Sequence, residues 1–451
     1  MSCITEVTGT QLCTGATAEA NSVLTAKYQI ELPAHWNGTL VLYSHGYNSF
    51  TVPLAPQDAG DPVTGAYLLS QGYALAGSAY ARAGWSLQQA FEDQIALVDL
   101  FGKTFGTPQR TIAWGHSLGG MITAGLVQLF PDRFTAALPM CGVVAGGPGV
   151  WNQGLDAEFA FKTLTAPNVK ILGFSGFADA GNNLGAATAA LVAAQATPQG
   201  RARNALSAAL ADVPGWIDPA SPEPAATDYA TREANQVAWN TSIDFLFAFF
   251  GRAELEARAG GNFSWNTGVD YRVQLSHSSD RDEVEALYAA AGLDLNNDLD
   301  TLNDAPRIAA NPAAVAYVSK YITYNGELNI PVLTLHTTGD GLVEVTDENA
   351  YASVVRSAGD NSMLRQVFVH RAGHCTFTPA ETITAFKTLI HRIDSGRWED
   401  STDPTAMNSG AAALGPAFNV LLPSFKATPP SFLDFHPDKF LRPFDARNLE
   451  G

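Results

Sequence analysis

The feature that most constrains this chain is the segment around Ser117, which reads Arg110-Thr-Ile-Ala-Trp-Gly-His-Ser-Leu-Gly-Gly120. An apolar, β-type run leads into the Gly-x-Ser-x-Gly motif, and a helical pattern begins directly after it. Strand, sharp turn and helix are the context in which this motif presents a nucleophilic serine. The small glycines tolerate strained backbone, and the N-terminus of the following helix directs free N–H groups at an oxyanion beside the serine. We therefore predict that Ser117 is a nucleophile rather than a serine in an ordinary β–α turn.

Strand and helix patterns alternate on both sides of this motif. The patterns predict strands at 26–32, 38–47, 73–80, 110–116 and 134–140 and helices at 66–71, 91–105 and 118–130. Such alternation predicts right-handed crossovers and a parallel sheet. The alternation stops at Cys141 and resumes at 331, with strands at 330–340 and 365–370 and helices at 348–357 and 380–393.

These patterns divide the chain into three parts. Residues 1–141 and 331–396 are predicted to form the α/β core, which begins with a polar lead-in at 1–25 that carries no sign of a site. Residues 142–330, rich in alanine, asparagine and aromatic residues, are predicted to form a mainly helical cap domain. The proline-rich tail, 397–451, is predicted to wrap the surface. The stretch 169–179 departs from the helical pattern of the insertion, because it reads as a strand followed by a turn and Asp179. Either this strand lies within the insertion, or the boundary at Cys141 is too early.

A serine hydroxyl needs a histidine base, which is itself held by a carboxylate. Asp340 follows a buried strand in Thr-Gly-Asp-Gly, and His374 follows the last predicted strand in Arg-Ala-Gly-His-Cys. The order serine, acid, histidine therefore favours Ser117, Asp340 and His374 as the catalytic residues. Asp179 and Asp347 are the alternatives for the acid, and His370 is the alternative for the base.

Composition limits the partners of the chain. It has 451 residues, 46% of them hydrophobic, and 44 acidic against 26 basic residues give a formal charge of −18. This acidity disfavours binding to nucleic acid or to anionic lipid, and no apolar run is long enough to cross a bilayer. The first residues lack the basic and apolar regions of a signal peptide, which indicates a mature or trimmed start. The oligomeric state does not follow from the sequence.

These motifs resemble those of the α/β-hydrolase superfamily, in particular its serine esterases and lipases. Gly115–Gly120 resembles the nucleophile segment, Ser44–Tyr47 the His-Gly oxyanion loop, and Gly339–Val343 with Gly373-His374 the acid and base loops. The resemblance covers residues 26–141 and 331–393. It implies an α/β-hydrolase fold, a mostly parallel sheet with a large helical cap. It also implies an oxyanion hole made of the backbone N–H groups of Tyr47 and Leu118, with His45 and His116 as structural residues.

The cysteines add a second, more distant resemblance. His374-Cys375 resembles the histidine loop of tannase-like and feruloyl esterases, in which a disulfide ties that loop to the residue before the serine; here that residue is His116. Cys141 ends the next strand at the same sheet edge and is the partner that we expect for Cys375. Cys3 and Cys13 are expected to form the second disulfide. Two disulfides favour a secreted or periplasmic protein.

Weaker signals concern ligands. Arg82 and Trp85 follow a strand end, where ligands collect in such sheets, so both are candidates for substrate binding; a loop salt bridge is the alternative for Arg82. Residues 294–300 resemble a calcium loop, but the required glycine and bidentate glutamate are missing, which favours a helix cap. We expect neither a metal nor a cofactor.

The expected function is hydrolysis of carboxylic esters through a covalent acyl-enzyme, with a small-molecule ester as the substrate. An amidase or peptidase would use the same residues, and a tannase- or feruloyl-type esterase and a non-catalytic binding module are further alternatives. The aromatic side chains of residues 142–330 cannot all be exposed, so some are expected to line a pocket over Ser117. A bounded pocket of this kind favours short or aromatic acyl groups without activation at an oil–water interface.

Overall fold

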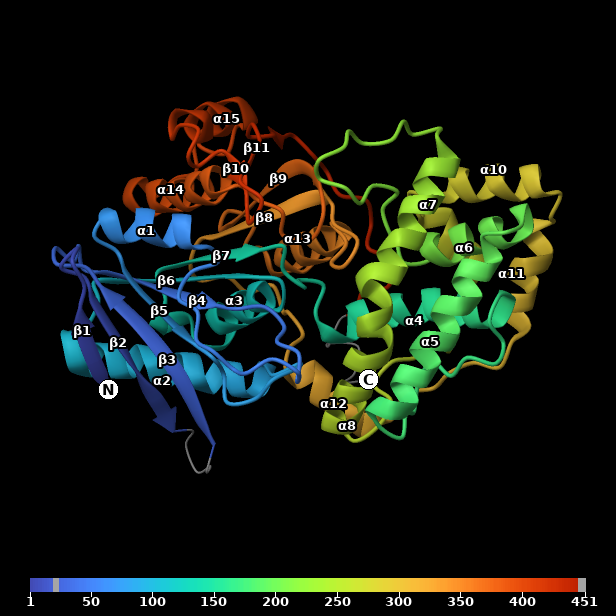
Figure 1. Cartoon of the computed structure of the whole chain (residues 1–451), viewed down its shortest axis with the longest axis horizontal. Coiled ribbons are helices and arrows are strands. Elements are labelled where there is room, and N and C mark those ends of the chain that lie inside the picture. The colour runs from blue at the N-terminus through green and yellow to red at the C-terminus, as the bar shows by residue number, and fades with distance from the viewer. Residues whose placement is uncertain (19–23, 445–451) are drawn as a thin grey trace.

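The computed structural model describes residues 1–18 and 24–444 (Figure 1). A ten-stranded sheet runs through the left part of the view in Figure 1, and a group of helices lies beside it on the right. The strands of this sheet are β1 (Ser2–Thr5), β2 (Gln11–Ala18), β3 (Thr25–Leu32), β4 (Thr39–Ser44), β5 (Ala74–Ser78), β6 (Arg110–His116), β7 (Ala136–Met140), β8 (Val332–Gly339), β9 (Leu364–Ala372) and β12 (Phe432–Leu433). A separate two-stranded sheet consists of β10 (Val420–Leu421) and β11 (Lys426–Ala427).

The strand order is β1-β2-β3-β5-β4-β6-β7-β8-β9-β12. Strands β5, β4, β6, β7, β8 and β9 pair in parallel, while β1 to β3 and β12 pair antiparallel at the two edges. This is the α/β-hydrolase fold. The polar lead-in at 1–25 is thus part of the sheet. Its residues form β1 and β2 at an exposed edge.

Helices cover both faces of the sheet. The helices packed with the sheet are α1 (Pro62–Ser70), α2 (Leu87–Phe105), α3 (Leu118–Leu129), α13 (Thr346–Ala358) and α14 (Pro379–Ser395), with a short 3₁₀ turn at Pro131–Arg133. On β4, Leu40 and Leu42 join the apolar cluster under α2 and α3, whereas Val41 and Tyr43 join the cluster that includes α14. The alternation of strand side chains thus supplies two cores, one on each face of the sheet.

Between β7 and β8 the chain leaves the sheet and forms helices. They are α4 (Gly147–Leu164), α5 (Phe177–Ala194), α6 (Pro198–Ala209), α7 (Tyr229–Trp239), the π-helical turns η2 (Asn240–Asp244) and η3 (Phe247–Gly251), α8 (Arg252–Ala259), α9 (Tyr271–His277), α10 (Arg281–Ala291), α11 (Leu295–Asp304) and α12 (Pro312–Lys320). Many of their apolar side chains form a third cluster, which includes Leu155, Phe159 and Leu206.

Residues 169–176 form no strand, so the strand that the sequence suggested at the start of 169–179 is wrong. Val169 and Ile171 are buried in the cluster of the insertion instead of pairing with a neighbouring strand, and α5 begins directly after the stretch. Asp179 lies in the first turn of this helix, where it pairs with Lys170.

The C-terminal segment does more than wrap the surface. After α15 (Pro404–Ala413), β12 pairs with β9 and adds the last strand of the sheet. Farther on, Phe440 is buried, and Arg442 forms an ion pair with Asp156 of α4. The segment therefore contacts both the sheet and the helical insertion. No helix within the described residues is long and apolar enough to cross a membrane.

Candidate active site

Ser117 lies in the tight turn between β6 and α3. Its backbone has φ 60° and ψ −128°, a conformation that costs a non-glycine residue about 1–3 kcal/mol. The turn also requires glycine on both sides of the serine. A Cβ atom at Gly119 would lie 1.9 Å from the carbonyl oxygen of Ser44, and one at Gly115 would lie 2.5 Å from the same oxygen. The glycines of the motif thus permit the close approach of β4 that brings its loop to Ser117.

Asp340 and His374 meet at the same edge of the sheet. Asp340 follows β8 and is buried, and its Oδ2 lies 2.7 Å from Nδ1 of His374, which follows β9. The other carboxyl oxygen, Oδ1, accepts hydrogen bonds of 3.1 Å from the backbone N–H groups of Leu342 and Val343. Both oxygens of the carboxylate are thereby fixed, and the imidazole is held in one orientation.

The alternatives for the acid and the base lie elsewhere. Asp179 is in α5 and Asp347 is in α13, where it accepts a hydrogen bond from the N–H of Ala145. The ring of His370 packs against Trp216 at an interplanar angle of 48°, and its Nε2 lies 3.5 Å from Oε2 of Glu223. Of the acids that the sequence offered, Asp340 alone forms a hydrogen bond to His374 within the described part of the chain.

A buried histidine behind Asp340 was not identified from the sequence. His336, in β8, places Nδ1 3.1 Å from Oε1 of Glu348 and Nε2 2.9 Å from the carbonyl oxygen of Val343. Two acceptors require two N–H donors, so this geometry fits the charged imidazolium. Burial opposes that charge, but the hydrogen bond and charge of Glu348, the charge of Asp340 and the Val343 carbonyl raise the pKa of His336 to about 9. Its Nε2 lies 3.7 Å from Oδ2 of Asp340.

Two disulfides form, as the sequence predicted. One joins Cys3 to Cys13, and the other joins Cys141, directly after β7, to Cys375, directly after His374. Nε2 of His374 lies 3.4 Å from Sγ of Cys375, and within the described residues no hydrogen bond of 3.5 Å or less joins it to Ser117. Hydrogen bonds between catalytic groups are often long without substrate and shorten when it binds.

The Cys141–Cys375 disulfide is expected to fix the histidine loop. Replacing both cysteines with serine should lower kcat by up to about a hundredfold, because a displacement of about 1 Å at a catalytic group has an effect of that size. The measurement is kcat well below the melting temperature of each variant. The matched control is the double serine variant of Cys3 and Cys13, whose disulfide links β1 and β2 at the far sheet edge. A Cys141/Cys375 variant that is folded and keeps kcat within about threefold would contradict this role.

The loop after β4 lies against Ser117. A Cβ atom on Gly46 would be 3.3 Å from Cβ of Ser117, so the backbone leading to Tyr47 passes close to the serine. Leu118 is the first residue of α3, and its N–H has no acceptor within the helix. These are the two residues whose N–H groups the sequence resemblance assigned to an oxyanion hole.

The histidines next to these residues are packed into the protein. His45 stacks on Tyr80 at 4.0 Å between ring centroids, and burial lowers its pKa. His116 lies 3.1 Å from the hydroxyl of Tyr43, and burial, with the nearby His374, lowers its pKa to about 4. No cluster of metal-binding side chains exists among the described residues, and Asp294 caps α11 instead of forming a calcium loop.

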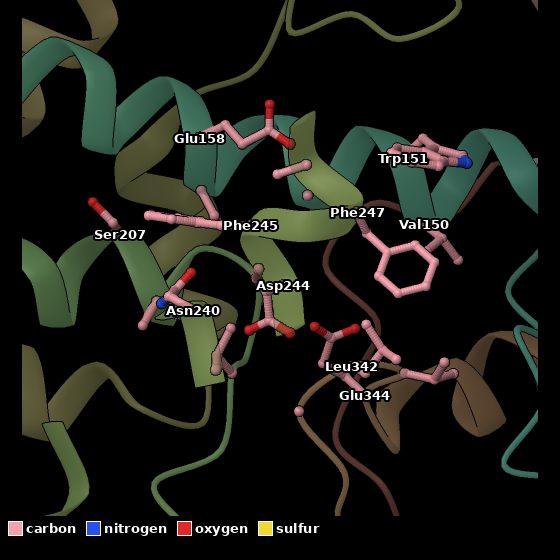
Figure 2. A pocket seen from close by; sticks show the side chains of 18 of the residues that line it. Val150, Trp151, Glu158, Ser207, Asn240, Asp244, Phe245, Phe247, Leu342 and Glu344 are labelled. Atoms are coloured by element: carbon pink, nitrogen blue, oxygen red, sulfur yellow. The ribbon is translucent and has the colours of Figure 1, made fainter. Parts of the chain in front are cut away.

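A cavity of about 150 Å³ opens at Ser117, a volume that accommodates a benzene-sized ring. The α/β core contributes Tyr47, Trp85, Ser117 and Leu118 to its wall, and the loop after Asp340 contributes 341–344. The rest of the wall comes from the insertion, which contributes Phe161. It also contributes Trp151, Phe245 and Phe247, which are labelled in Figure 2. Of the two predicted substrate-binding residues, Trp85 lines this cavity. Arg82 is exposed and lies in a separate depression beside α8.

Comparisons with known proteins agree with a hydrolase. Residues 66–146, which run from within α1 past the serine turn to the residue before α4, match the prolyl oligopeptidase family. A curated relative, the o-phthalyl amidase of Xanthobacter agilis, is 29% identical over 425 residues, which cover 86% of this chain and 89% of the relative.

Solved structures with a similar fold include two proteins of Aspergillus oryzae. Feruloyl esterase B is 15% identical, with a TM-score of 0.44 over 86% of this chain and 82% of its own. Another esterase is 14% identical, with a TM-score of 0.46 over 87% and 81% of the two chains.

Proposed function

We propose that this chain, a serine hydrolase of the α/β-hydrolase superfamily that acts on esters or amides, takes small aromatic carboxylic acids as its acyl groups and cleaves both their amides and their esters. The observation that carries the proposal is the cavity of about 150 Å³ that is lined by Ser117 together with aromatic side chains. The relative whose name specifies a phthalyl group supports an aromatic ring in the acyl group. An enzyme that expels an amine also expels the better leaving group of an ester.

In this proposal Ser117 attacks the carbonyl carbon, and His374 accepts its proton and later donates it to the leaving group. Asp340 holds Nδ1 of His374 and stabilises the imidazolium that forms. The N–H groups of Leu118 and Tyr47 bind the oxyanion, and each such donor contributes about 3 kcal/mol to transition-state stabilisation. Water then releases the acid from Ser117 by the same steps.

His336 acts on Asp340 in this mechanism. Asp340 is buried, and burial disfavours a carboxylate unless a positive charge or hydrogen bonds stabilise it. The imidazolium of His336, 3.7 Å from Oδ2, supplies such a charge without taking the place of His374. We infer that His336 is a positioning residue that holds the Asp340 carboxylate beside His374.

The insertion, residues 142–330, is proposed to act as a fixed cap that selects the acyl group. Its helices have an apolar cluster of their own, and opening such a cap would expose that area to water at a large cost in free energy. The two disulfides support a secreted or periplasmic location, where such bonds persist.

A panel of p-nitrophenyl esters tests the acyl specificity. The benzoate should have a kcat/KM at least about tenfold above that of the dodecanoate, because a C12 chain does not fit a cavity of this volume. The rate should show no jump above the solubility limit of a long-chain ester. Preference for emulsified long-chain esters would contradict the fixed cap. The p-nitroanilide of benzoic acid tests the amide, and no release of nitroaniline would restrict the activity to esters.

A further inference from the structure

The cavity at Ser117 contains acidic side chains that the proposed reaction does not use. Asp244, at the end of η2, Glu344, in the loop after Asp340, and Glu158 of α4 line its wall. Figure 2 shows the carboxyl groups of Asp244 and Glu344 pointing toward one another across the space. None of the lining residues that the structure describes is a lysine, an arginine or a histidine.

Asp244 lacks the partners that a buried carboxyl group normally has. Both of its carboxyl oxygens are buried, and neither forms a hydrogen bond with any group in the described part of the chain. Other buried acids here are paired: Asp156 binds Arg442 and Tyr271, and Asp280 binds Arg232. A buried polar group without a hydrogen-bond partner destabilises a protein, and more so when it is charged. An acid retained under these conditions at the wall of a substrate cavity points to a ligand that satisfies it.

Glu158 differs from the other two acids of the cavity. Its Oε2 lies 3.5 Å from Nε of Arg252, a fully buried guanidinium that also stacks against Trp151 and Phe263. Glu158 therefore has a cationic partner outside the cavity, although burial still raises the pKa of Glu158 to about 7. Among the described residues, no lysine, arginine or histidine forms an ion pair with Asp244 or Glu344. Burial raises the pKa of both acids. The charge of Asp340 adds to both shifts, and the charges of Asp347 and Asp244 add to the shift of Glu344.

We propose that Asp244 and Glu344 form a subsite for a positively charged, hydrogen-bond-donating substituent of the acyl group, an ammonium or an amidinium. Such a group would supply the donors that the Asp244 oxygens lack, and its charge would stabilise both carboxylates. The aromatic rings of Phe245 and Phe247 line the same space, and an aromatic ring attracts a cation that lies over its face.

This inference rests on the proposed function, and three p-nitrophenyl esters of matched size test it. Their acyl groups are 4-(aminomethyl)benzoate, which is cationic, 4-ethylbenzoate, which is neutral, and 4-carboxybenzoate, which is anionic. The wild type should prefer the cationic ester over both the neutral and the anionic ester by about tenfold in kcat/KM. Benzamidine should inhibit competitively, and benzoate should inhibit much more weakly.

The variants then assign the preference to the two acids. Asp244→Asn and Glu344→Gln should each remove most of the preference for the cationic ester, measured in each variant as the ratio of kcat/KM for the cationic ester to kcat/KM for the neutral ester. Glu285→Gln, at an exposed acid of α10, is the control with the same loss of charge. If Asp244→Asn does not fold, Glu344→Gln decides the question.

The outcomes separate this inference from the function on which it rests. Turnover of all three esters without an order set by charge, or with the anion fastest, overturns the cation subsite alone. A preference that survives in both variants does the same. Failure to hydrolyse any of the esters, together with no labelling of Ser117 by a fluorophosphonate, overturns the proposed function.

Discussion

Replacing Ser117 with alanine should lower kcat for an aromatic ester by about a million-fold, because removing the nucleophile of a comparable triad has an effect of that size. The fold should not change, since alanine fits the same turn and the glycines that permit it remain. The measurement is steady-state hydrolysis of p-nitrophenyl benzoate, together with thermal melting.

Ser207→Ala is the matched control, because Ser207 also lines the cavity but lies on α6, away from His374. It should retain most of the activity. Residual activity of Ser117→Ala within about tenfold of wild type, at an unchanged Tm, would show that another residue is the nucleophile.

Asp340→Asn should lower kcat by about ten thousandfold, the effect seen when the acid of such a triad becomes an amide. An asparagine can still accept the hydrogen bonds from Leu342 and Val343 through its carbonyl oxygen. Its NH₂ group would then face Nδ1 of His374, which would have to become the acceptor, so Nε2 would carry the proton and could not act as a base.

The comparison is Asp340→Asn against Asp179→Asn at equal protein stability. Asp179 is bound to Lys170 and Ser175 at the start of α5, so its amide variant should keep nearly full kcat. A larger loss in Asp179→Asn than in Asp340→Asn would mean that the acid has been assigned to the wrong residue.

The sequence predicted the sheet and the three candidate catalytic residues because both depend on local patterns and on topology. A parallel strand buried on both faces is a run of apolar residues, and the loops at its C-terminal end reach one sheet edge. Ser117, Asp340 and His374 follow three such strands, β6, β8 and β9. The pairing of Cys141 with Cys375 could be predicted because both cysteines follow strands that end at this edge of the sheet.

Other parts depend on contacts that no local pattern records. Strand β1 is exposed along its whole length, so its residues lack an alternating pattern. The stretch at Val169 resembles a strand because its apolar residues fill the core of the insertion. His336 could have been noticed as a histidine within a buried strand, but its charge depends on Glu348, which comes from α13. Asp244 and Glu344 lie a hundred residues apart, and only the folded chain brings them into one cavity.

The Cys141–Cys375 bond also acts on the unfolded chain. It joins residues 234 positions apart and encloses the whole helical insertion in one covalent ring. In the chain-entropy model, closing a loop of this length removes enough freedom from the unfolded ensemble to stabilise the native state by about 5 kcal/mol. The helices of the insertion thus fold inside a ring whose two ends meet beside His374, so a local opening of these helices cannot carry the histidine loop away from β7.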